Sequence, residues 1–473
     1  MMARTGRRGF LKHGLIAAGG LGLGLTAWSR IAGGGTPPVF HKALGPLAPV
    51  NDQTSGLPIL NLPQGFQYQS FAWAGETLGD GYPSPSSCDG MGVVKEEHGI
   101  VTLVRNHELR GSSGPIGDPE KAWDNTGGGT TTLKFDTVRG RPLDSLISLG
   151  GTLNNCAGGV TPWGTWLSCE EAPMTPALRH LGGDSRQKLW RLKDARKSHG
   201  YVFEVRPEGE QNPRPIKAMG QFYHEATAID PDSGVVYMTE DKAPYAGFYR
   251  YLPDVPGQLH QGGKLQMLRV EGRNELIRSV PRGKPMATDW VDIADPGQGH
   301  AARTHDGAGV VNQGLLAGAT AFLSLEGCIF HDGIVYFTSK AGGEAGAGQV
   351  FRLDIAQGLL ELIYEATDRN SFSGPDNIVF SPRGSLMICE DRLGMFTKAQ
   401  YIAGLSELDG LFAFCQVNPD LKGTYKGHNL SRTALSSEWA GVCFSADGQW
   451  MFVNLYNPGV TFAISGPWQD GPV

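Results

Sequence analysis

The sequence predicts an all-β fold, a six-bladed β-propeller with inserted loops and a metal site at the mouth of its central channel. Three observations lead to this prediction. Glycine makes up 68 of 473 residues and charged residues only 19%, a composition that disfavours helices and suits strands joined by tight turns. A glycine turn followed by a short apolar run occurs six times. Acidic residues recur at matching places around these runs.

The repeated unit has the pattern of a β-hairpin. Each copy places a short apolar stretch and turn residues, such as Pro-Asp-Ser-Gly or His-Asp-Gly, before a second strand-forming run. The second runs are GIVTLVRNHE from Gly99, GTWLSCEE from Gly164, GVVYMTED from Gly234, GIVYFTSK from Gly333, GSLMICED from Gly384 and GQWMFVNL from Gly448. Six copies of one pattern favour six propeller blades over a sandwich of unrelated hairpins.

Other segments complete the expected domain. Strand-forming residues at 201–205 and 348–354 predict outer strands, whereas 110–125 and 295–319 predict long loops that help to shape a site. We expect a signal segment over 1–35, a linker over 36–60 and a single propeller domain over 61–473.

The N-terminus has the pattern of a twin-arginine export signal. Arg7 and Arg8 precede Phe10-Leu11-Lys12 and a glycine-rich apolar run. The alternative is the basic start of a membrane helix, but the run is short for a span. The predicted partner is therefore the twin-arginine translocation machinery, and the predicted location is periplasmic or extracellular. This pathway carries folded proteins, often with metals already bound.

The net charge is −6, and no basic cluster follows the N-terminus. Nucleic-acid binding needs a clustered cationic face and is not expected. Phosphate esters could still bind if cations lay between them and the protein, and we expect a monomer. The seven cysteines are odd in number and irregularly spaced, which argues against a disulfide framework. Cys389 and Cys415 follow apolar strand residues and are expected to be buried free thiols.

Residues shortly before the six glycines form a potential ring of ligands. In a propeller they would converge on the channel. They are Asp89, Cys156, Glu225, Glu326, Asp376 and Glu438. Two unit charges about 4 Å apart repel by roughly 4 kcal/mol at an effective dielectric constant near 20. Such a ring therefore requires protonation of some members or bound cations.

A second acidic set ends the second strands: Glu108, Glu170, Glu171, Glu240, Asp241, Glu390 and Asp391. Taken singly, each could be a solvated charge at a blade edge. Together the two sets offer oxygen ligands suited to Ca²⁺, Mg²⁺ or Fe³⁺, and a thiolate from Cys156 would point to a transition metal.

Other chemistries have little support. There is no Cys-x-x-Cys or His-Glu-x-x-His for zinc and no Gly-x-Ser-x-Gly for a serine hydrolase. His107 and His224 each precede a glutamate, but we expect them to be structural or to orient ligands. The stretch NNCAGGVTPWGTWLSCEE, residues 154–171, leaves open whether Cys156 and Cys169 form a disulfide or surround a metal.

That stretch, with RNHE before it and YHEATAIDPDSGVVYMTED after it, resembles the PhoX family of bacterial alkaline phosphatases over residues 60–460. The resemblance implies a six-bladed propeller and a phosphomonoester hydrolase with a ferric pair and calcium ions bridged by an oxide. It implies Cys156 as an iron ligand, with Glu240 and Glu326 as iron-binding and catalytic glutamates. For calcium it favours Glu108, Glu171 and Asp376; Glu225 completes the predicted metal set.

The chain departs from the family in two respects. It is shorter than typical members. Family members also have a phosphate-contacting arginine two residues before the bridging glutamate, where this chain has Ser324. Arg105, Lys242 and Lys340 lie near strand ends and are candidate replacements.

Two alternatives remain on the sequence alone. Six-bladed propellers with a channel metal also act as calcium-dependent lactonases or esterases. A propeller with structural calcium could instead be a non-enzymatic binding module. The family resemblance favours metal-dependent hydrolysis of small phosphate esters, with Fe³⁺ and Ca²⁺ as cofactors.

Overall fold

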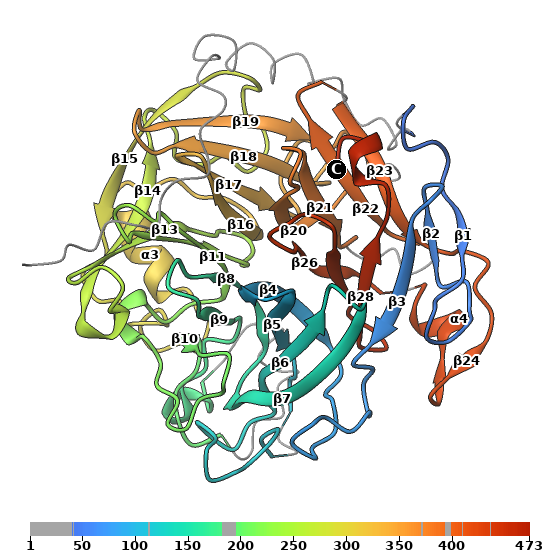
Figure 1. Ribbon diagram of the computed structural model, residues 1–473. Coiled ribbons are helices and arrows are strands. Elements are labelled where there is room, and N and C mark those ends of the chain that lie inside the picture. The colour runs from blue at the N-terminus through green and yellow to red at the C-terminus, as the bar shows by residue number, and fades with distance from the viewer. Residues whose placement is uncertain are drawn as a thin grey trace, which may run out of the picture.

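Six inner strands adjoin one another in a closed ring around a central channel (Figure 1). The protein is described by a computed structural model over residues 40, 42–111, 114–181, 195–369, 372–392, 399–408, 410–435 and 437–473. The inner strands are β4 (Cys88–Glu97), β8 (Asn155–Val160), β11 (His224–Ile229), β16 (Leu325–His331), β20 (Pro375–Phe380) and β26 (Trp439–Phe444). The propeller prediction is confirmed, and the ring of inner strands matches the six hairpins. The predicted export signal lies outside the described residues.

Each inner strand starts a blade of antiparallel strands. The first blade continues as β5 (Ile100–His107), β6 (Gly128–Asp136) and β7 (Arg141–Thr152). The second continues as β9 (Trp166–Glu170) and β10 (Val202–Val205). The third continues as β12 (Val236–Glu240), β13 (Phe248–Pro253), β14 (Gly263–Val270) and β15 (Met286–Asp292). The fourth blade continues as β17 (Ile334–Ser339), β18 (Gln349–Asp354) and β19 (Leu359–Glu365). The fifth continues as β21 (Leu386–Glu390), β22 (Tyr401–Ser406) and β23 (Gly410–Val417). The sixth continues as β27 (Met451–Leu455) and β28 (Val460–Ser465). The third and fourth blades join at their outer edge, where β15 pairs with β19.

The N-terminal strands complete the last two blades. β3 (Gln67–Phe71) pairs with β28, so the sixth blade combines an N-terminal strand with the last strands of the chain. β2 (Leu60–Leu62) pairs with β23 and carries β1 (Ala48–Val50) on its outer side. Part of the predicted 36–60 linker therefore belongs to a blade.

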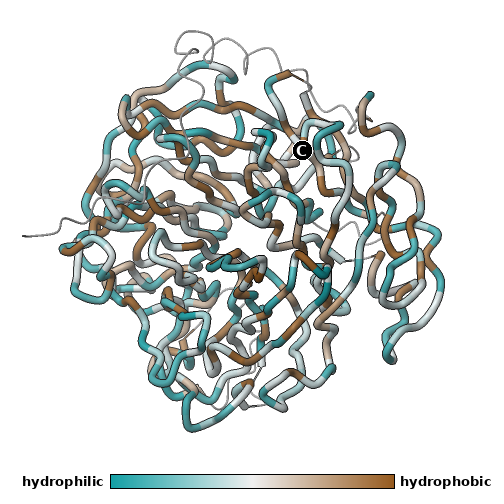
Figure 2. Tube along the Cα trace, in the orientation of Figure 1, coloured by the Kyte–Doolittle hydropathy of each residue, from teal (hydrophilic) through white to brown (hydrophobic). Residues whose placement is uncertain are grey.

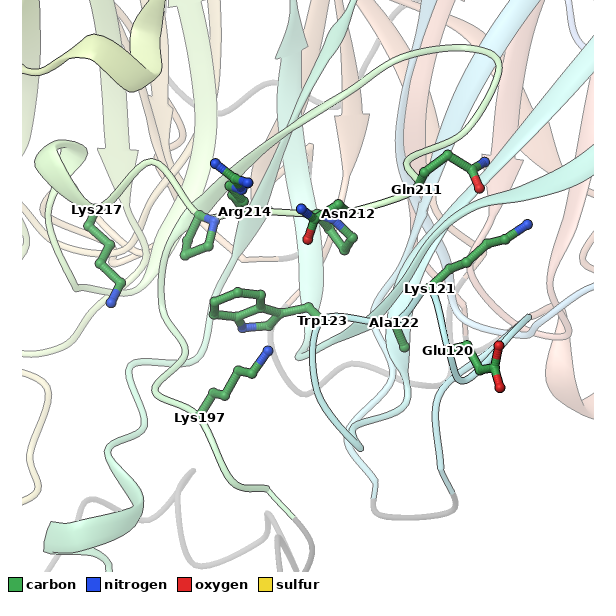
Figure 3. Close-up of a pocket in the computed structure, with 11 residues that line it drawn as sticks. Glu120, Lys121, Ala122, Trp123, Lys197, Gln211, Asn212, Arg214 and Lys217 are labelled. Atoms are coloured by element: carbon green, nitrogen blue, oxygen red, sulfur yellow. The ribbon is translucent and has the colours of Figure 1, made fainter.

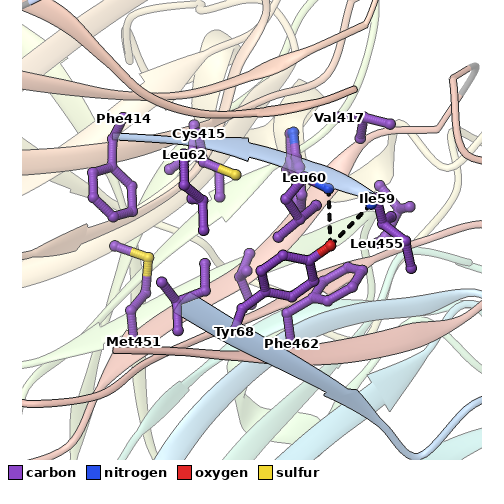
Figure 4. Packing of buried hydrophobic residues seen from close by; sticks show 14 of the residues in the cluster. Ile59, Leu60, Leu62, Tyr68, Phe414, Cys415, Val417, Met451, Leu455 and Phe462 are labelled. Atoms are coloured by element: carbon purple, nitrogen blue, oxygen red, sulfur yellow. Dashed lines mark hydrogen bonds between the residues drawn. The ribbon is translucent and has the colours of Figure 1, made fainter. Parts of the chain in front are cut away.

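The Tyr68 hydroxyl ties these N-terminal strands together. It accepts hydrogen bonds from the N–H groups of Ile59 and Leu60 at 2.9 and 3.1 Å (Figure 4). It donates one to the Val50 carbonyl at 3.1 Å. Its ring packs edge-on against Phe462 of β28, with centroids 5.7 Å apart. A buried hydroxyl with such partners avoids the cost of an unsatisfied polar group.

The apolar core lies largely between adjacent blades. Phe248 of the third blade stacks on Phe337 of the fourth with centroids 4.2 Å apart. Phe135 of the first blade meets Phe452 of the sixth edge-on at 5.2 Å. Apolar stretches follow the strands, and hydrophilic ones concentrate in the loops around the rim (Figure 2). Burial of these faces holds neighbouring blades together.

Few helices interrupt this pattern in the described residues. α3 (Gly309–Leu316) lies inside the segment 295–319 that was predicted as a loop, and α4 (Leu430–Thr433) follows the small hairpin of β24 (Thr424–Tyr425) and β25 (His428–Asn429). The remaining helical turns are η2 (Pro176–Leu178), η3 (Lys217–Met219), η4 (Leu259–Gln261) and η5 (Trp468–Asp470). Within the described ranges, no helix is both long and apolar enough to cross a membrane.

Candidate metal centre

One backbone hydrogen bond recurs in every blade at the same end of the channel. The residue after the second strand donates its N–H to the carbonyl of the residue before the inner strand, at 2.8–3.2 Å. The donor–acceptor pairs are Glu108–Ser87, Glu171–Asn154, Asp241–Tyr223, Lys340–Ser324, Asp391–Gly374 and Tyr456–Glu438. Because the bond repeats, the six donor residues occupy equivalent places around the channel mouth.

Several acceptor residues have a strained backbone. Ser87, Asn154 and Ser324 adopt φ values of 52°, 53° and 43°. The equivalent Gly374 adopts 63° without strain, because glycine has no Cβ. Side chains other than glycine rarely occupy this left-handed region, and such strain is concentrated at functional sites. The positive φ values of these three turns therefore indicate that the backbone at the channel mouth is held in a conformation that costs local stability.

A second ring lies just inside the first. Asp89, Cys156, Glu225, Glu326 and Asp376 are each the second residue of their inner strand. In all five strands the pairing register shifts at that point. A β-bulge re-aims side chains in this way.

The two rings combine into three groups whose potential ligand atoms lie within 4.8 Å of one another. They are Glu108–Cys156–Glu171, Asp89–Glu108–Glu438 and Glu225–Glu326–Asp376. The three groups contain eight different residues, which come from widely separated parts of the sequence. Six of the seven predicted metal ligands are among them, and Glu240 is the exception. Such clusters suit hard cations, and the thiol suits a transition metal.

Glu225 gives the clearest sign that a cation belongs here. Its side chain is fully buried, and neither carboxylate oxygen has a hydrogen-bond partner among the described residues. A buried, unpaired carboxylate is costly. A bound cation shared with Glu326 and Asp376 would remove that cost.

Burial and mutual repulsion act on the whole cluster. Burial first, and then neighbouring carboxylates, raise the pKa values of Asp89 and Glu225 well above the ordinary range. The same causes raise the pKa of the Cys156 thiol, whose Sγ lies 3.5 Å from Asp89 Oδ2. Cations would favour the ionised forms and reverse this trend.

The motif around Cys156 is explained by close packing. A Cβ on Gly158 would lie 1.8 Å from the Leu167 carbonyl oxygen, and one on Gly159 would lie 2.1 Å from the Thr227 carbonyl oxygen. Only glycine fits such approaches. Asn106 of β5 donates to the Cys156 and Ala157 carbonyls at 3.2 and 2.6 Å, which fixes this segment against the first blade.

The cysteine pair does not form a disulfide. All seven cysteines fall within the described residues and are free. Cys169 is fully buried in β9, whereas Cys156 is partly exposed at the mouth. Cys389 and Cys415 are buried free thiols, as predicted.

The family model for alkaline phosphatase PhoX matches residues 43–133 and 134–459. The chain belongs to the PhoX alkaline phosphatase family. It is therefore an alkaline phosphatase-like phosphoric monoester hydrolase, and its substrates are phosphate esters. Membership of this family favours hydrolysis of phosphate monoesters over the lactonase and binding-module alternatives. No curated protein sequence matches the chain.

One solved structure confirms the fold, and a second is more distantly similar. Pseudomonas fluorescens PhoX, in complex with the transition-state analogue vanadate, superposes with a TM-score of 0.62 at 19% identity, covering 91% of this chain and 99% of that one. The Xanthomonas campestris gluconolactonase XC5397 gives a TM-score of 0.40 at 11% identity, covering 90% and 98%. The PhoX likeness shows the same propeller.

In this PhoX chain, Glu240 lies apart from the three acidic groups. Its Oε2 accepts hydrogen bonds from the Gly247 N–H and the Tyr249 hydroxyl, both at 2.8 Å, while its buried Oε1 has no partner among the described residues. The neighbouring Asp241 occupies the channel-mouth position instead. The structure thus does not bring Glu240 together with Cys156, although its predicted ligand role remains a prediction.

The two histidines beside glutamates have structural partners. His107 bonds to the Ser86 carbonyl at 2.9 Å and to Thr131 at 3.0 Å. His224 bonds to the Gly220 carbonyl at 2.9 Å and stacks on Phe222. Among the described residues, neither belongs to a potential metal-binding group.

The candidate replacements for the family arginine differ in position. Arg105 is buried and bonds to Ala72, Ser84, Thr131 and Thr461, away from the acidic groups. The Lys242 ammonium donates to the Asp306 carbonyl at 3.0 Å. The Lys340 ammonium lies 2.8 Å from Glu326 Oε1.

Sequence reasoning missed Arg110. Its guanidinium pairs with Glu108 and donates to Asn154 Oδ1 at 2.6 Å, and its side chain is 46% exposed. It thus lies beside the Glu108–Cys156–Glu171 group with an open side toward solvent. Its position at the start of a predicted site-shaping loop was the available signal.

The remaining hollows have different chemistry. The far part of the channel is a cavity of about 490 Å³ lined by residues such as Met91, Val160, Ile329, Phe380 and Phe444. A hollow of about 410 Å³ on the outside gathers Lys121, Lys197, Arg214 and Lys217 around Trp123 (Figure 3). The first is apolar and the second cationic, so the carboxylate-rich mouth is the place suited to metals.

Proposed function

We propose that the chain hydrolyses phosphate monoesters with an iron and calcium centre at the channel mouth. The observation that carries this proposal is the set of three acidic groups around Cys156 and the unpartnered Glu225. Cys156 and Glu326 would hold iron, whereas Glu108, Glu171 and Asp376 would hold calcium. Glu225 would complete the set of metal ligands.

When bound, these cations would supply positive charge that polarises the phosphoryl group. The chain itself would orient the substrate and shield the cluster. Arg110 offers a partly exposed guanidinium suited to phosphate oxygens. Asn154 supports the site because its amide bonds to Glu171 Oε2 at 3.0 Å.

The test is metal analysis by mass spectrometry combined with turnover of p-nitrophenyl phosphate on the same sample of exported protein. We expect iron and calcium together with turnover. Cys156→Ala should remove iron and activity, whereas Cys169→Ala, a buried cysteine in the adjacent strand, should keep both. Calcium without iron in the active protein would overturn the iron assignment.

We also propose export by the twin-arginine machinery to the periplasm or beyond, and a monomeric state. The adjacent Arg7 and Arg8 support the export route. Replacing both with lysine should retain the protein in the cytoplasm, as cell fractionation would show. Light scattering would test the monomer, and a dimer mass would contradict it.

A further inference from the structure

The fourth blade places a cationic side chain at the channel mouth. Five of the six equivalent positions hold Glu108, Glu171, Asp241, Asp391 and Tyr456, whereas the fourth blade holds Lys340. Its backbone makes the same repeated hydrogen bond, to Ser324, as the acidic residues make in their blades. The fourth blade therefore has the same backbone geometry at this position as the acidic blades, but its side chain carries the opposite charge.

The Lys340 side chain is held on several sides. Its Nζ lies 2.8 Å from Glu326 Oε1, 3.0 Å from Asp391 Oδ2 and 3.7 Å from Asp376 Oδ2. The side chain is only 12% exposed. A compact ammonium surrounded by three carboxylates occupies the kind of position that a small cation would take.

The opposite side of the mouth has a less enclosed cation. Arg110, which pairs with Glu108, has a side chain that is 46% exposed and therefore open to solvent. Lys340 has no comparable open path, because leaving would separate it from three buried or half-buried carboxylates. A metal ion could therefore displace the Arg110 guanidinium more easily than the Lys340 ammonium.

We propose that the Lys340 ammonium is a permanent cation of the centre, which takes the place of a metal ion beside Glu326, Asp376 and Asp391. Glu326 and Asp376 then share their negative charge between this ammonium and the metal ions beside Cys156 and Glu225. This inference rests on the proposed metal-dependent function. Lys340 also provides a positive charge in the blade where Ser324 stands in place of the family arginine.

The test compares calcium binding and total metal content in the full-length wild type, Lys340→Gln and Lys340→Arg. Calcium is added to metal-stripped protein in a calorimeter, and native metal content is measured by mass spectrometry. We expect Lys340→Gln to bind one further calcium ion per chain and Lys340→Arg to match the wild type. Lys242→Gln, which removes the nearby ammonium bonded to Asp306, should also match it.

A charge-balanced double variant controls for misfolding caused by the loss of one positive charge. Lys340→Gln combined with Asp391→Asn removes one charge of each sign and should keep the wild-type metal content. Equal calcium binding by wild type and folded Lys340→Gln would overturn the inference, as would loss of metal in that variant. If Lys340→Gln does not fold alone, added calcium should restore its thermal unfolding transition; no restoration would also overturn it.

The two proposals can fail separately. Wild-type protein without iron or calcium would contradict the proposed centre, yet new calcium binding in Lys340→Gln would still support the role of Lys340. Wild-type protein with metals and an unchanged Lys340→Gln variant would contradict only the role of Lys340.

Discussion

Two neighbouring glutamates at the end of β9 have opposite surroundings. Glu170 faces the blade and bonds to the N–H groups of Leu153, Gly200 and Tyr201 and to His199, at 2.6–3.1 Å. Glu171 faces the channel, within 4.8 Å of potential ligand atoms on Glu108 and Cys156. The first carboxylate has its charge satisfied by the protein, whereas the second lies among other acids. Glu170 therefore stabilises the fold, whereas Glu171 lies where a bound cation would offset the repulsion between carboxylates.

The alternation recurs in other blades. Glu240 accepts hydrogen bonds inside its blade, and Asp241 lies at the mouth. Glu390 bonds to Arg392 and to backbone N–H groups, and Asp391 meets Lys340. Successive side chains of a strand point to opposite faces. An acidic pair at a strand end thus contributes one structural and one channel-facing carboxylate.

The sharpest test of this difference is Glu171→Gln. We expect it to fold but to lose phosphatase activity by more than about 100-fold, because even residues that only support metal ligands cost 10- to 100-fold when changed. Hydrolysis of p-nitrophenyl phosphate and metal content measure the effect. Normal activity with full metal content would remove Glu171 from the centre.

The matched change on the blade side is Glu170→Gln. We expect a loss of about 3–5 kcal/mol in the free energy of unfolding, since it leaves His199 without one of its buried partners. Urea denaturation provides the measurement, and metal content per folded molecule should stay at the wild-type value. A stable variant that lacks metal would contradict the division between the two faces.

The blade-side network should also depend on pH. Burial alone would lower the pKa of His199, but Glu170 and Asp124 raise it to about 9. Because the folded pKa exceeds the unfolded value near 6.5, this stabilisation is complete below pH 6.5 and is lost as the pH rises through 9. The full effect is about 3 kcal/mol. Denaturation of wild type and His199→Gln across this window should show a steeper decline in the wild type.

The smallest expected effect concerns Glu240. Glu240→Gln should lower stability by only about 1–3 kcal/mol, because the amide oxygen can still accept from Gly247 and Tyr249. Iron and calcium content should remain unchanged, whereas Asp241→Asn should alter it. Loss of iron in Glu240→Gln would identify Glu240 as a ligand and contradict the distinction between blade-facing and channel-facing carboxylates.

The sequence predicted the propeller and most of the cluster because both rest on local repeats. Glycine turns marked the hairpins, and residues before them converge once the strands form a ring. The choice between Glu240 and Asp241 needed the pairing register, which the repeat alone does not specify. The contacts of Lys340 depend on residues from the fourth and fifth blades, so its role was not evident from its own segment.

The pairing of β3 with β28 has a consequence for the timing of synthesis. The sixth blade needs residues from both the beginning and the end of the domain, and one potential metal group joins Asp89 to Glu438. A ribosome-bound chain that lacks its last strands cannot bring these carboxylates together. Cluster assembly must therefore follow translation, and a chain truncated before Glu438 should be unable to complete this part of the centre.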